Sequence, residues 1–428
     1  MTPSPSPRVS FQTIGCRLNQ AETAAMTAGF LAAGYVTTAP ELPCDAAVVH
    51  GCAITRKAER DSARAARAAR KTSPEAVIIV AGCPAEVLGD ALRGECPADL
   101  IVGQAGKQAL PALLHRLHPD RFPAPPAATG GTPLPAFDTK RALVKVQDGC
   151  DFRCTYCIVP AARGAPRSRP LADVATELRR LAEQGFREVV LTGANLGCYA
   201  HGTHGLLDVI RAAEAVPGLE RIRLSSIETT TVVRAVIDHM ATSAKLCHFL
   251  HVPLQSGDDG ILQAMGRRYT TADYADTIAH AAARIPDIGI GTDLITGFPG
   301  EDDAAFETTM RFVESLPLSN LHVFPYSSRA GTRAVELLGQ VPVAVRKERA
   351  RRLIALGAAQ RAAFARRFSG RHAAVLVERV TPDGTAHGWT GEYLPAEIRE
   401  AGGPVNRVVT LQVDAVEGER LVGRVAGD

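Results

Sequence analysis

The sequence predicts an α/β protein with an N-terminal parallel α/β domain, a partial (β/α)6 TIM-type barrel and a small C-terminal β-barrel. Three patterns lead to this prediction. Short β-branched runs alternate with helical segments over residues 9–117, further strand candidates alternate with helices over 143–326, and only short strand patterns follow residue 372. Regular alternation of strands and helices is typical of parallel sheets, whereas consecutive strands without helices favour antiparallel sheets or barrels.

The N-terminal domain is expected over residues 1–118. Its strands are predicted at 9–14, 46–50 and 76–81, and its first two helices at about 19–33 and 56–71. We expect Asn19 to cap the first helix, because Asn favours the N-cap position, and Gly34 to end it, because glycine is common after the last helical residue. Strands that alternate with helices imply a parallel sheet whose strands all end along one edge.

The central barrel is expected over residues 141–365, after a linker at 119–140 in which Pro, Gly, Ala and Thr replace any hydrophobic period. Helices such as 171–184 and 271–284 lie between its predicted strands. The six strand candidates are 143–147, 187–192, 220–226, 247–253, 288–295 and 320–326. Six β/α units do not complete a TIM barrel, so we expect the barrel to be open on one side.

The C-terminal domain is expected over residues 366–428, where strand patterns are short and closely spaced. An Arg-rich helix that begins at Pro342 and ends near Phe368 leads into it. Its strands are predicted at 373–380, 388–394, 408–413 and 420–425. Short strands without intervening helices favour a small β-barrel.

The composition excludes several classes of protein. The 428 residues, 46% of them hydrophobic, can bury the core of a multidomain protein. No apolar run approaches the roughly 18 residues of a membrane span, and Met1 to Ser10 lacks the hydrophobic region of a signal peptide. We therefore expect a cytoplasmic protein with no membrane partner. Thiols stay reduced in that compartment, so the ten cysteines indicate metal or redox chemistry rather than disulfides.

Cys150, Cys154 and Cys157 form a CxxxCxxC loop just after the first predicted barrel strand. Three closely spaced thiolates can hold three irons of a [4Fe-4S] cluster and leave the fourth iron open for a ligand. Active sites of β/α barrels lie at the carboxyl ends of the strands, where this loop falls. Zinc is the alternative, but zinc sites usually bring paired CxxC units and a fourth ligand, and neither stands nearby.

Cys16, Cys52 and Cys83 each follow one strand of the N-terminal domain, and each comes directly after a glycine. Because parallel strands end along one edge, the three thiols could converge there as a second metal site. The alternative is three buried cysteines that act as small hydrophobic residues. The other four cysteines show no such pattern and are predicted to be structural: Cys44, Cys96, Cys198 and Cys247.

Basic residues gather in three places although the formal net charge is only +3. These places are residues 56–71, 163–169 and 346–367. If the domains pack together, the three clusters could form one surface that binds phosphates. The helical spacing of the arginines in 56–71 is equally typical of a solvated helix face.

The segment QDGCDFRCTYCIVPAARG (147–164) resembles the radical S-adenosylmethionine (SAM) methylthiotransferases. The resemblance implies that the open iron chelates SAM and that reduction yields a 5'-deoxyadenosyl radical. It also implies an auxiliary cluster on Cys16, Cys52 and Cys83, and hence two [4Fe-4S] clusters with SAM as cofactors. No catalytic side chain is predicted beyond the cluster ligands.

Contacts to SAM are predicted at the ends of the barrel strands, where small and polar residues cluster. LTGANLG (191–197) ends the second strand and meets the SAM amino group in the resembling family, while ordinary turn chemistry is the alternative. Further polar segments end the third, fourth and fifth strands, at LSSIE (224–228), HVPLQSG (251–257) and GTDLITGFPGE (291–301). The candidate residues are Thr192, Asn195, Ser226, Glu228, Gln255 and Asp293.

The segment VLVERVTPDGTAHGWTGEYLPAEI (375–398) resembles the TRAM domain, a small β-barrel associated with RNA binding. The resemblance implies a tRNA partner. Trp389 and Tyr393 could offer stacking faces to bases, or could belong to the core of the barrel.

GCRLNQAET (15–23), LHVFPYSSRAGT (321–332) and RKERARRL (346–353) resemble the methylthiotransferase branch that acts on N6-threonylcarbamoyladenosine beside the tRNA anticodon. The resemblance implies insertion of a methylthio group at C2 of the adenine. One SAM methylates a sulfur held at the auxiliary cluster, and a second SAM gives the radical that removes the C2 hydrogen. An electron donor such as flavodoxin or ferredoxin is implied, whereas the sulfur donor is unknown.

Two alternatives stay open within the enzyme class and one outside it. The related branches act on isopentenyladenosine in tRNA or on an aspartate of a ribosomal protein. A protein of another class would bind RNA and use Fe-S clusters for structure or redox sensing, without turnover. Analysis of tRNA nucleosides separates the first two from the predicted activity, and release of 5'-deoxyadenosine separates the third.

Overall fold

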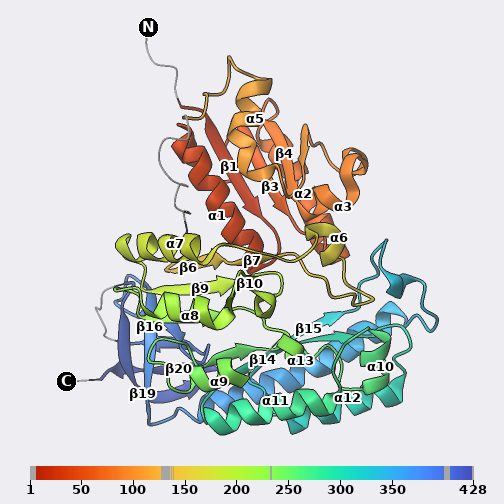
Figure 1. Cartoon of the computed structure of the whole chain (residues 1–428), viewed down its shortest axis with the longest axis vertical. Coiled ribbons are helices and arrows are strands. Elements are labelled where there is room, and N and C mark those ends of the chain that lie inside the picture. Colours follow the sequence, from red (N-terminus) through yellow and green to blue (C-terminus); the bar gives the residue numbers. More distant parts are fainter. Residues whose placement is uncertain are drawn as a thin grey trace.

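The structure is a computed structural model that describes residues 6–126, 135, 137, 139–231, 234–399 and 405–426. An N-terminal α/β unit lies at the top of Figure 1, a barrel in the middle and a small β-barrel at the lower left. Part of the predicted linker, residues 127–134, 136 and 138, lies outside the described residues. The domain boundaries at 118, 140 and 365 stay predictions.

The N-terminal unit is a five-stranded parallel sheet of order β2-β1-β3-β4-β5. Its strands are β1 (Arg8–Thr13), β2 (Val36–Thr38), β3 (Ala46–Gly51), β4 (Val77–Gly82) and β5 (Leu100–Val102). Its helices are α1 (Arg17–Ala32), α2 (Arg56–Thr72), α3 (Cys83–Leu88), α4 (Leu92–Glu95) and α5 (Leu110–Leu117). The three predicted strands are confirmed, whereas β2 and β5 were missed because three-residue strands carry too little pattern.

Asn19 does not cap α1, so that prediction was wrong. Cys16 occupies the N-cap position, and Asn19 is buried within the first turn of the helix. The Asn19 amide Nδ2 donates to the backbone oxygens of Ile14 and Gly51, at 2.8 Å each. The side chain thus connects the segments that follow β1 and β3, a contact that a local sequence pattern cannot reveal. Gly34 follows the end of the helix with φ +86°, as predicted.

The central unit is an open barrel of six parallel strands, which confirms the predicted fold. The strands pair in chain order as β6-β9-β12 and β13-β14-β15, and the two sets meet at a parallel bridge between Ile222 and Leu246. The strands are β6 (Arg141–Lys145), β9 (Glu188–Thr192), β12 (Arg221–Leu224), β13 (Phe249–His251), β14 (Gly289–Thr296) and β15 (Asn320–Pro325). Within the described chain β6 does not pair with β15, so the barrel is open there.

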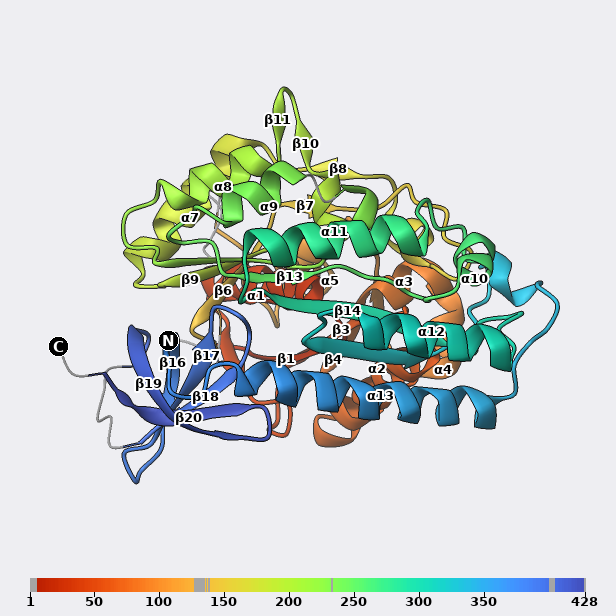
Figure 2. The same cartoon turned by 90° about the horizontal axis from the view of Figure 1, so that it is seen from below.

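Helices cover the outside of this barrel. They are α7 (Leu171–Glu183), α8 (Leu206–Glu214), α9 (Arg234–Met240), α10 (Asp259–Ala264), α11 (Thr271–Arg284) and α12 (Asp303–Ser315). Shorter elements follow the first strand: β7 (Gln147–Asp148), α6 (Val159–Arg163) and β8 (Arg167–Ser168). A small hairpin of β10 (Ala200–His201) and β11 (His204–Gly205) projects from the barrel in Figure 2. Amphipathic helices such as α7, with Val174 and Leu178 fully buried, seal the strands from solvent.

Alternation along the barrel strands separates the core from the lumen. The helix-facing side chains belong to one hydrophobic cluster: Ala142, Val144, Val189, Leu191, Ile222, Leu224, Leu250, Val252, Ile290 and Leu294. Residues between them face the lumen, because successive side chains of a strand point to opposite sides. Many of the lumen-facing residues are polar or charged: Arg141, Lys145, Glu188, Thr192, Arg221, Arg223, His251 and Asp293. Leu143, Val190 and Phe249 occupy the same side of their strands and add apolar surface. The lumen thus offers charged and polar groups for a site.

The C-terminal unit is a closed five-stranded barrel of order β16-β17-β18-β20-β19, as predicted. Its strands are β16 (His372–Val380), β17 (Ala386–Thr390), β18 (Pro395–Ile398), β19 (Val408–Glu417) and β20 (Arg420–Val425). The predicted strand at 388–394 was wrong in extent, because a turn at 391–393 separates β17 from β18. The long helix α13 (Val343–Arg366) runs beneath the central barrel and leads into this unit (Figure 2).

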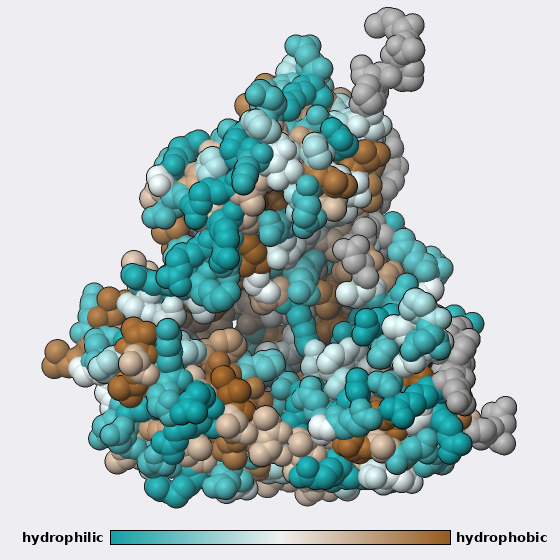
Figure 3. Space-filling model, turned by 180° about the vertical axis from the view of Figure 1, so that it is seen from behind, coloured by the Kyte–Doolittle hydropathy of each residue, from teal (hydrophilic) through white to brown (hydrophobic). Residues whose placement is uncertain are grey.

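The face of the molecule shown in Figure 3 is mostly hydrophilic and is hollowed between the N-terminal unit and the rest. Among the described residues, no helix is both long and apolar enough to cross a membrane.

Candidate active site

The CxxxCxxC loop leaves the barrel directly after β7 and turns at Gly149, whose φ is +73°. A Cβ at this position would lie 2.1 Å from the backbone oxygen of Ala165, so only glycine fits. Burial, together with the nearby Cys154 and Cys150 thiols, raises the pKa of Cys157 to about 12. The thiols are thus close enough to influence one another, and a positive metal centre would favour their thiolate forms.

Cys16, Cys52 and Cys83 converge at the edge of the N-terminal sheet. Burial, together with the nearby Cys16 and Cys83 thiols, raises the pKa of Cys52 to about 12. Gly15 has φ +113°, and a Cβ there would lie 2.7 Å from the Cβ of Cys52. The strand ends therefore bring three widely spaced thiols together, as the glycines before them suggested.

The thiol groups suit clusters better than single ions. Zinc binds sulfur at about 2.3 Å, which places the thiolates of one ion roughly 4 Å apart. In the described part of the chain, the only three metal-type ligand atoms that lie within 4.8 Å of one another belong to His251, Asp293 and His322. Among the described residues, the three sulfur atoms of neither cysteine triad all lie this close together. Each triad offers three thiols, the number that holds a [4Fe-4S] cluster with one open iron.

Helix α6 connects the two cysteine sites. Helix α6 begins two residues after Cys157, and its Ala162 packs on Cys83 and Ala53. Gln104 joins them from a third direction, because its Nε2 donates to the Cys83 sulfur at 3.4 Å and to the Ala162 backbone oxygen at 3.0 Å. The segment that follows the CxxxCxxC loop therefore packs against the Cys83 side of the N-terminal unit.

A buried charge network underlies this junction, and we call it the Glu22 network. Its members are Glu22, Lys107, Lys145, Asp148 and Arg163. Glu22 Oε2 lies 2.6 Å from Lys107 Nζ, and Glu22 Oε1 lies 2.6 Å from Lys145 Nζ. Arg163 Nη2 lies 3.2 Å from Glu22 Oε2, and Arg163 Nη1 lies 3.0 Å from Asp148 Oδ1. Although burial opposes it, the three cations hold the pKa of Glu22 well below its ordinary value.

The predicted SAM contacts lie around the CxxxCxxC loop but differ in exposure. Asn195 is buried beside Cys150, and its polar side chain lowers the pKa of that thiol against the effect of burial. Thr192 is buried and faces the lumen, whereas Ser226 is exposed. Glu228 pairs with Arg267, whose Nη1 also lies 3.3 Å from the Cys154 sulfur. All remain candidate contacts.

Unsatisfied polar atoms support a ligand at this position. Both side-chain polar atoms of Asn195 are buried without a hydrogen-bond partner, as are the hydroxyls of Ser225 and Thr229. Buried polar atoms in proteins almost always have partners, so the cluster of orphans indicates a polar group that binds here. Gln255, which lies shortly after β13, has φ +72°, a strained conformation for a non-glycine residue. These residues fit the chelated amino acid part of SAM.

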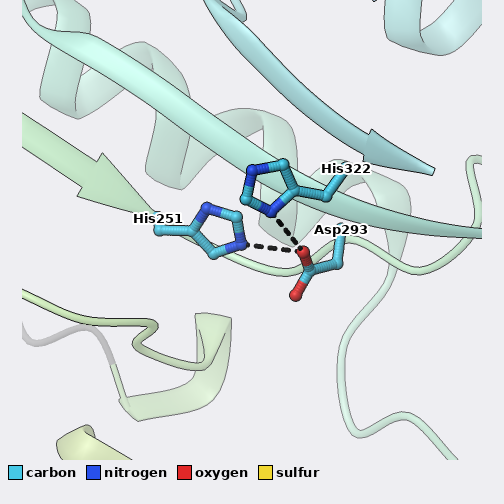
Figure 4. Close-up of side chains that lie close together, drawn as sticks. All are labelled: His251, Asp293 and His322. Atoms are coloured by element: carbon cyan, nitrogen blue, oxygen red, sulfur yellow. Dashed lines mark ion pairs between the residues drawn. The ribbon is translucent and has the colours of Figure 1, made fainter. Parts of the chain in front are cut away.

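Asp293 forms a hydrogen-bonded group with two histidines instead of standing alone (Figure 4). His251 Nε2 lies 3.0 Å and His322 Nδ1 lies 3.3 Å from the same carboxylate oxygen, and the other oxygen points away. His322 Nε2 lies 3.3 Å from the Asn320 amide nitrogen, a donor, so Nδ1 carries the proton toward Asp293. The group is therefore a hydrogen-bonded polar wall of the lumen.

The small barrel closes the amino ends of the strands. Arg223 Nε pairs with Glu188 at 2.9 Å, and its two terminal nitrogens donate to the backbone oxygens of Gly391 and Thr390, each at 3.0 Å. Arg221 Nη1 donates to the Trp389 oxygen at 3.0 Å. The turn after β17 is thus held by buried cations, and Tyr393 enters the lumen.

Trp389 and Tyr393 stack on one another, with ring centroids 4.9 Å apart. Tyr393 also lies 4.9 Å from the Phe249 ring, so it belongs to the contact between the two barrels rather than to the core of the small one. A groove of about 360 Å³ runs beside both rings and reaches His322 and Arg361. The faces left open by this packing line the groove.

Arg163 and Arg349 do not contribute to a phosphate-binding surface. Arg163 is buried in the Glu22 network, and Arg349 is buried against Glu301, 2.8 Å away. On α2, Arg70 pairs with Asp99 and Arg64 pairs with Asp61. These four arginines are therefore engaged by groups of the protein itself.

Sequence reasoning missed the residues that organise the cysteine sites: Asn19, Glu22, Gln104, Lys107 and Arg163. Asn19 Oδ1 accepts from Arg163 Nη2 at 2.6 Å, which ties the segment after Cys16 to the end of α6. The only local sign of this network was that α1 carries two polar residues, Asn19 and Glu22, at positions that are buried in the structure. Cys198 is also closer to the chemistry than expected, since the Cys150 thiol adds to the burial that raises its pKa to about 11.

Comparisons with known proteins agree with this arrangement. Residues 144–313 match the Radical SAM superfamily, which implies a [4Fe-4S] cluster and SAM, and residues 8–103 match Uncharacterized protein family UPF0004. The radical S-adenosylmethionine methyltransferase TsrM from Kitasatospora setae has a similar structure, with a TM-score of 0.55 at 15% identity, over 74% of this chain and 73% of that one. At this identity the likeness supports the fold alone.

Relatives in sequence span nearly the whole chain. The threonylcarbamoyladenosine tRNA methylthiotransferase MtaB of Bacillus subtilis (strain 168) is 31% identical over 95% of this chain and 93% of its own length. The tRNA-2-methylthio-N(6)-dimethylallyladenosine synthase of Thermodesulfovibrio yellowstonii is 30% identical over 98% of this chain and 96% of its own. The protein belongs to the radical-SAM methylthiotransferase family.

Proposed function

We propose that this protein inserts a methylthio group at C2 of N6-threonylcarbamoyladenosine beside the anticodon of tRNA. The contact between the two cysteine sites carries the proposal, because α6 leads from Cys157 to a packing contact with Cys83. A radical source that α6 connects to a second cysteine site suits a reaction that joins sulfur to carbon. The Bacillus subtilis relative bears this activity in its name.

Six cysteines hold the two cofactors in this proposal. Cys150, Cys154 and Cys157 bind one [4Fe-4S] cluster and SAM, and Cys16, Cys52 and Cys83 bind a second cluster. When bound, these groups supply the 5'-deoxyadenosyl radical and the methylthio sulfur.

The protein's own side chains bind and orient. Asn195 and Ser225 carry the unpaired polar atoms nearest the CxxxCxxC loop and receive the amino acid part of SAM. Arg267 fixes Glu228 and donates toward the Cys154 sulfur, so the loop is held from the barrel side. Arg163 keeps the segment after Cys16 in place through Asn19.

The partners follow from this chemistry. A low-potential donor such as flavodoxin or ferredoxin supplies electrons, tRNA enters at the open side of the barrel, and the reaction takes place in the cytoplasm. In this proposal residues 1–118 and 141–365 hold the cofactors, and residues 366–428 carry the aromatic pair Trp389 and Tyr393.

The test is anaerobic turnover of reconstituted protein with tRNA, followed by mass spectrometry of the nucleosides. We expect the 2-methylthio derivative of threonylcarbamoyladenosine together with 5'-deoxyadenosine. Product only on isopentenyladenosine would assign the protein to the other tRNA branch. Failure of reduced, cluster-loaded protein to release 5'-deoxyadenosine would remove the enzyme proposal in favour of a non-catalytic Fe-S protein.

A further inference from the structure

Arg17 stands out among the cations near the lumen because it has no carboxylate partner. It opens α1 directly after Cys16, and its Nη2 donates to the Tyr393 hydroxyl at 2.8 Å. Its guanidinium carbon lies 5.4 Å from the centre of the Tyr393 ring. Across the described residues, no Asp or Glu oxygen lies within ion-pair distance of Arg17.

The neighbouring arginines are all neutralised. Arg141 Nε lies 2.7 Å from Glu378, and Arg223 Nε lies 2.9 Å from Glu188. Both also lie over the Tyr393 ring, at 6.0 Å and 5.0 Å from its centre. Despite its burial, these cations and Arg17 lower the pKa of Tyr393. A half-buried guanidinium in such a place still has donors free for an anion.

One side of the Arg17 site is formed by Tyr393 and the two rings on which it packs, and we call this side the Tyr393 floor. Tyr393 is held with φ +69°, a strained conformation for a non-glycine residue, and its ring packs on Phe249 and Trp389. The groove beside this floor extends to His322, whose Nδ1 points to Asp293. Tyr393 thus lies between the unpaired cation of Arg17 and a groove lined by aromatic and polar side chains.

We propose that Arg17, above the Tyr393 floor, binds the carboxylate of the threonylcarbamoyl group and thereby selects an anionic N6 substituent. This inference rests on the proposed function and deepens it. A threonylcarbamoyl group ends in a carboxylate, which a guanidinium binds through two charge-assisted hydrogen bonds. An isopentenyl group has no charge and would leave Arg17 unpaired in a half-buried site, which opposes its binding.

The position of Arg17 also fits the reaction. It is the neighbour of Cys16, a proposed ligand of the auxiliary cluster, so a substrate anchored at Arg17 lies beside the site of sulfur transfer. Arg17 comes from the N-terminal unit, whereas Tyr393 comes from the small barrel, 376 residues later. The substituent would thus be read at a point where all three parts of the molecule meet.

The test compares two substrates and three variants. Anticodon stem-loops carry either threonylcarbamoyladenosine or its methyl ester, which keeps the shape and removes the charge. The variants are Arg17→Gln, Arg17→Lys and the matched control Arg311→Gln, which removes an exposed arginine on α12. Rates are expressed per cluster-bound iron, so that any loss of cluster beside Cys16 does not lower the apparent kcat.

For the unchanged protein we expect the ester to raise KM by about 10- to 100-fold, the range for losing a charge-assisted hydrogen bond, with a smaller change in kcat. In Arg17→Gln the acid and the ester should have similar, high KM values. Arg17→Lys should restore part of the preference for the acid, and Arg311→Gln should behave as the unchanged protein does.

The outcomes separate the two proposals. If Arg17→Gln still prefers the acid as strongly as the unchanged protein, Arg17 does not read the carboxylate and the inference is overturned. If the unchanged protein makes product from isopentenyladenosine but none from the acid, the proposed function itself fails, and this inference fails with it. The ester comparison requires no folding of a variant, so equal KM values for acid and ester in the unchanged protein also overturn the inference.

Discussion

The two ends of the central barrel are both closed by buried ion pairs, but the cations are used differently. At the carboxyl ends of the strands, Glu22 faces Lys107, Lys145 and Arg163. At the amino ends, Glu188 pairs with Arg221 and Arg223, which also donate to backbone oxygens of the small barrel. The amino-end cations fix a domain contact. The cations at the other end lower the pKa of the Cys83 thiol against the effect of burial, so they favour its thiolate form.

The comparison suggests a division of labour, with chemistry at the carboxyl ends of the strands and recognition at the amino ends. It also explains why the N-terminal unit needs a long-range charge network, whereas the CxxxCxxC loop is built from one short segment. Thiols from three strands must be held together by side chains of other elements. Substitutions at the two ends should therefore have different effects.

The largest effect is expected from the cysteines. Both Cys154→Ala and Cys52→Ala should abolish methylthio product, because each removes a ligand of a proposed cluster. Only Cys154→Ala should also abolish release of 5'-deoxyadenosine, and each variant should lose about four irons per chain. Product and 5'-deoxyadenosine are measured by mass spectrometry after anaerobic reconstitution, with Cys96→Ala as the control. Normal product formation by Cys52→Ala would contradict the role of the second site.

The next largest effect is expected from the centre of the Glu22 network. Glu22→Gln removes the carboxylate that three buried cations share, and breaking a buried pair by deleting one partner costs about 3–5 kcal/mol. The free energy of unfolding, from denaturant titration of the protein, should fall by that amount. Exposed Glu314→Gln on α12 is the control. A change below about 1 kcal/mol would show that the network is not stabilising.

A smaller effect is expected at the amino ends of the barrel strands. Arg221→Met leaves Arg223 to pair with Glu188 and removes one donor from the Trp389 backbone oxygen, so it should cost about 1–3 kcal/mol. Limited proteolysis should then release the small barrel faster than in the unchanged protein. Equal cleavage rates would indicate that the carbonyl contacts do not hold the two barrels together.

The smallest effect is expected from mild acid. The pKa values of Glu22 and Glu188 are lowered from 4.5, so the unfolded chain takes up these protons first as the pH falls. Their contribution to stability is therefore complete above pH 4.5 and is lost below it. The free energy of unfolding, followed against pH, should decline more gently in Glu188→Gln. An identical slope in that variant would mean that Glu188 does not contribute.

Much of the fold was predictable because its elements carry strong local patterns. The six barrel strands, the helices α7 and α11, and the closed C-terminal barrel were all anticipated. The strand at 388–394 was drawn too long, because a turn held by Arg223 from the central barrel interrupts it. Asn19 was misjudged for the same reason, since its partners Gly51 and Arg163 lie far away in the sequence.

The candidate site divides in a similar way. The six cysteines could be named from spacing and strand ends, and that assignment stays a prediction, as do the SAM contacts. The structure brings Asn195 to Cys150, and it shows Ser225 rather than Ser226 as the buried hydroxyl at the end of β12. Which of two adjacent serines faces the lumen depends on the side of the sheet, and the strand's last residue does not fix it.

The sequence by itself determined the chemistry on offer: two cysteine sets, a β/α barrel to hold one of them and a small barrel after it. These follow from residue type and local period, which are properties of short segments. Only the tertiary structure decided which charges are paired. Glu22 meets Lys107 and Arg163, and Arg17 meets Tyr393 without an acid, because burial and pairing arise from contacts between segments that are distant in the chain.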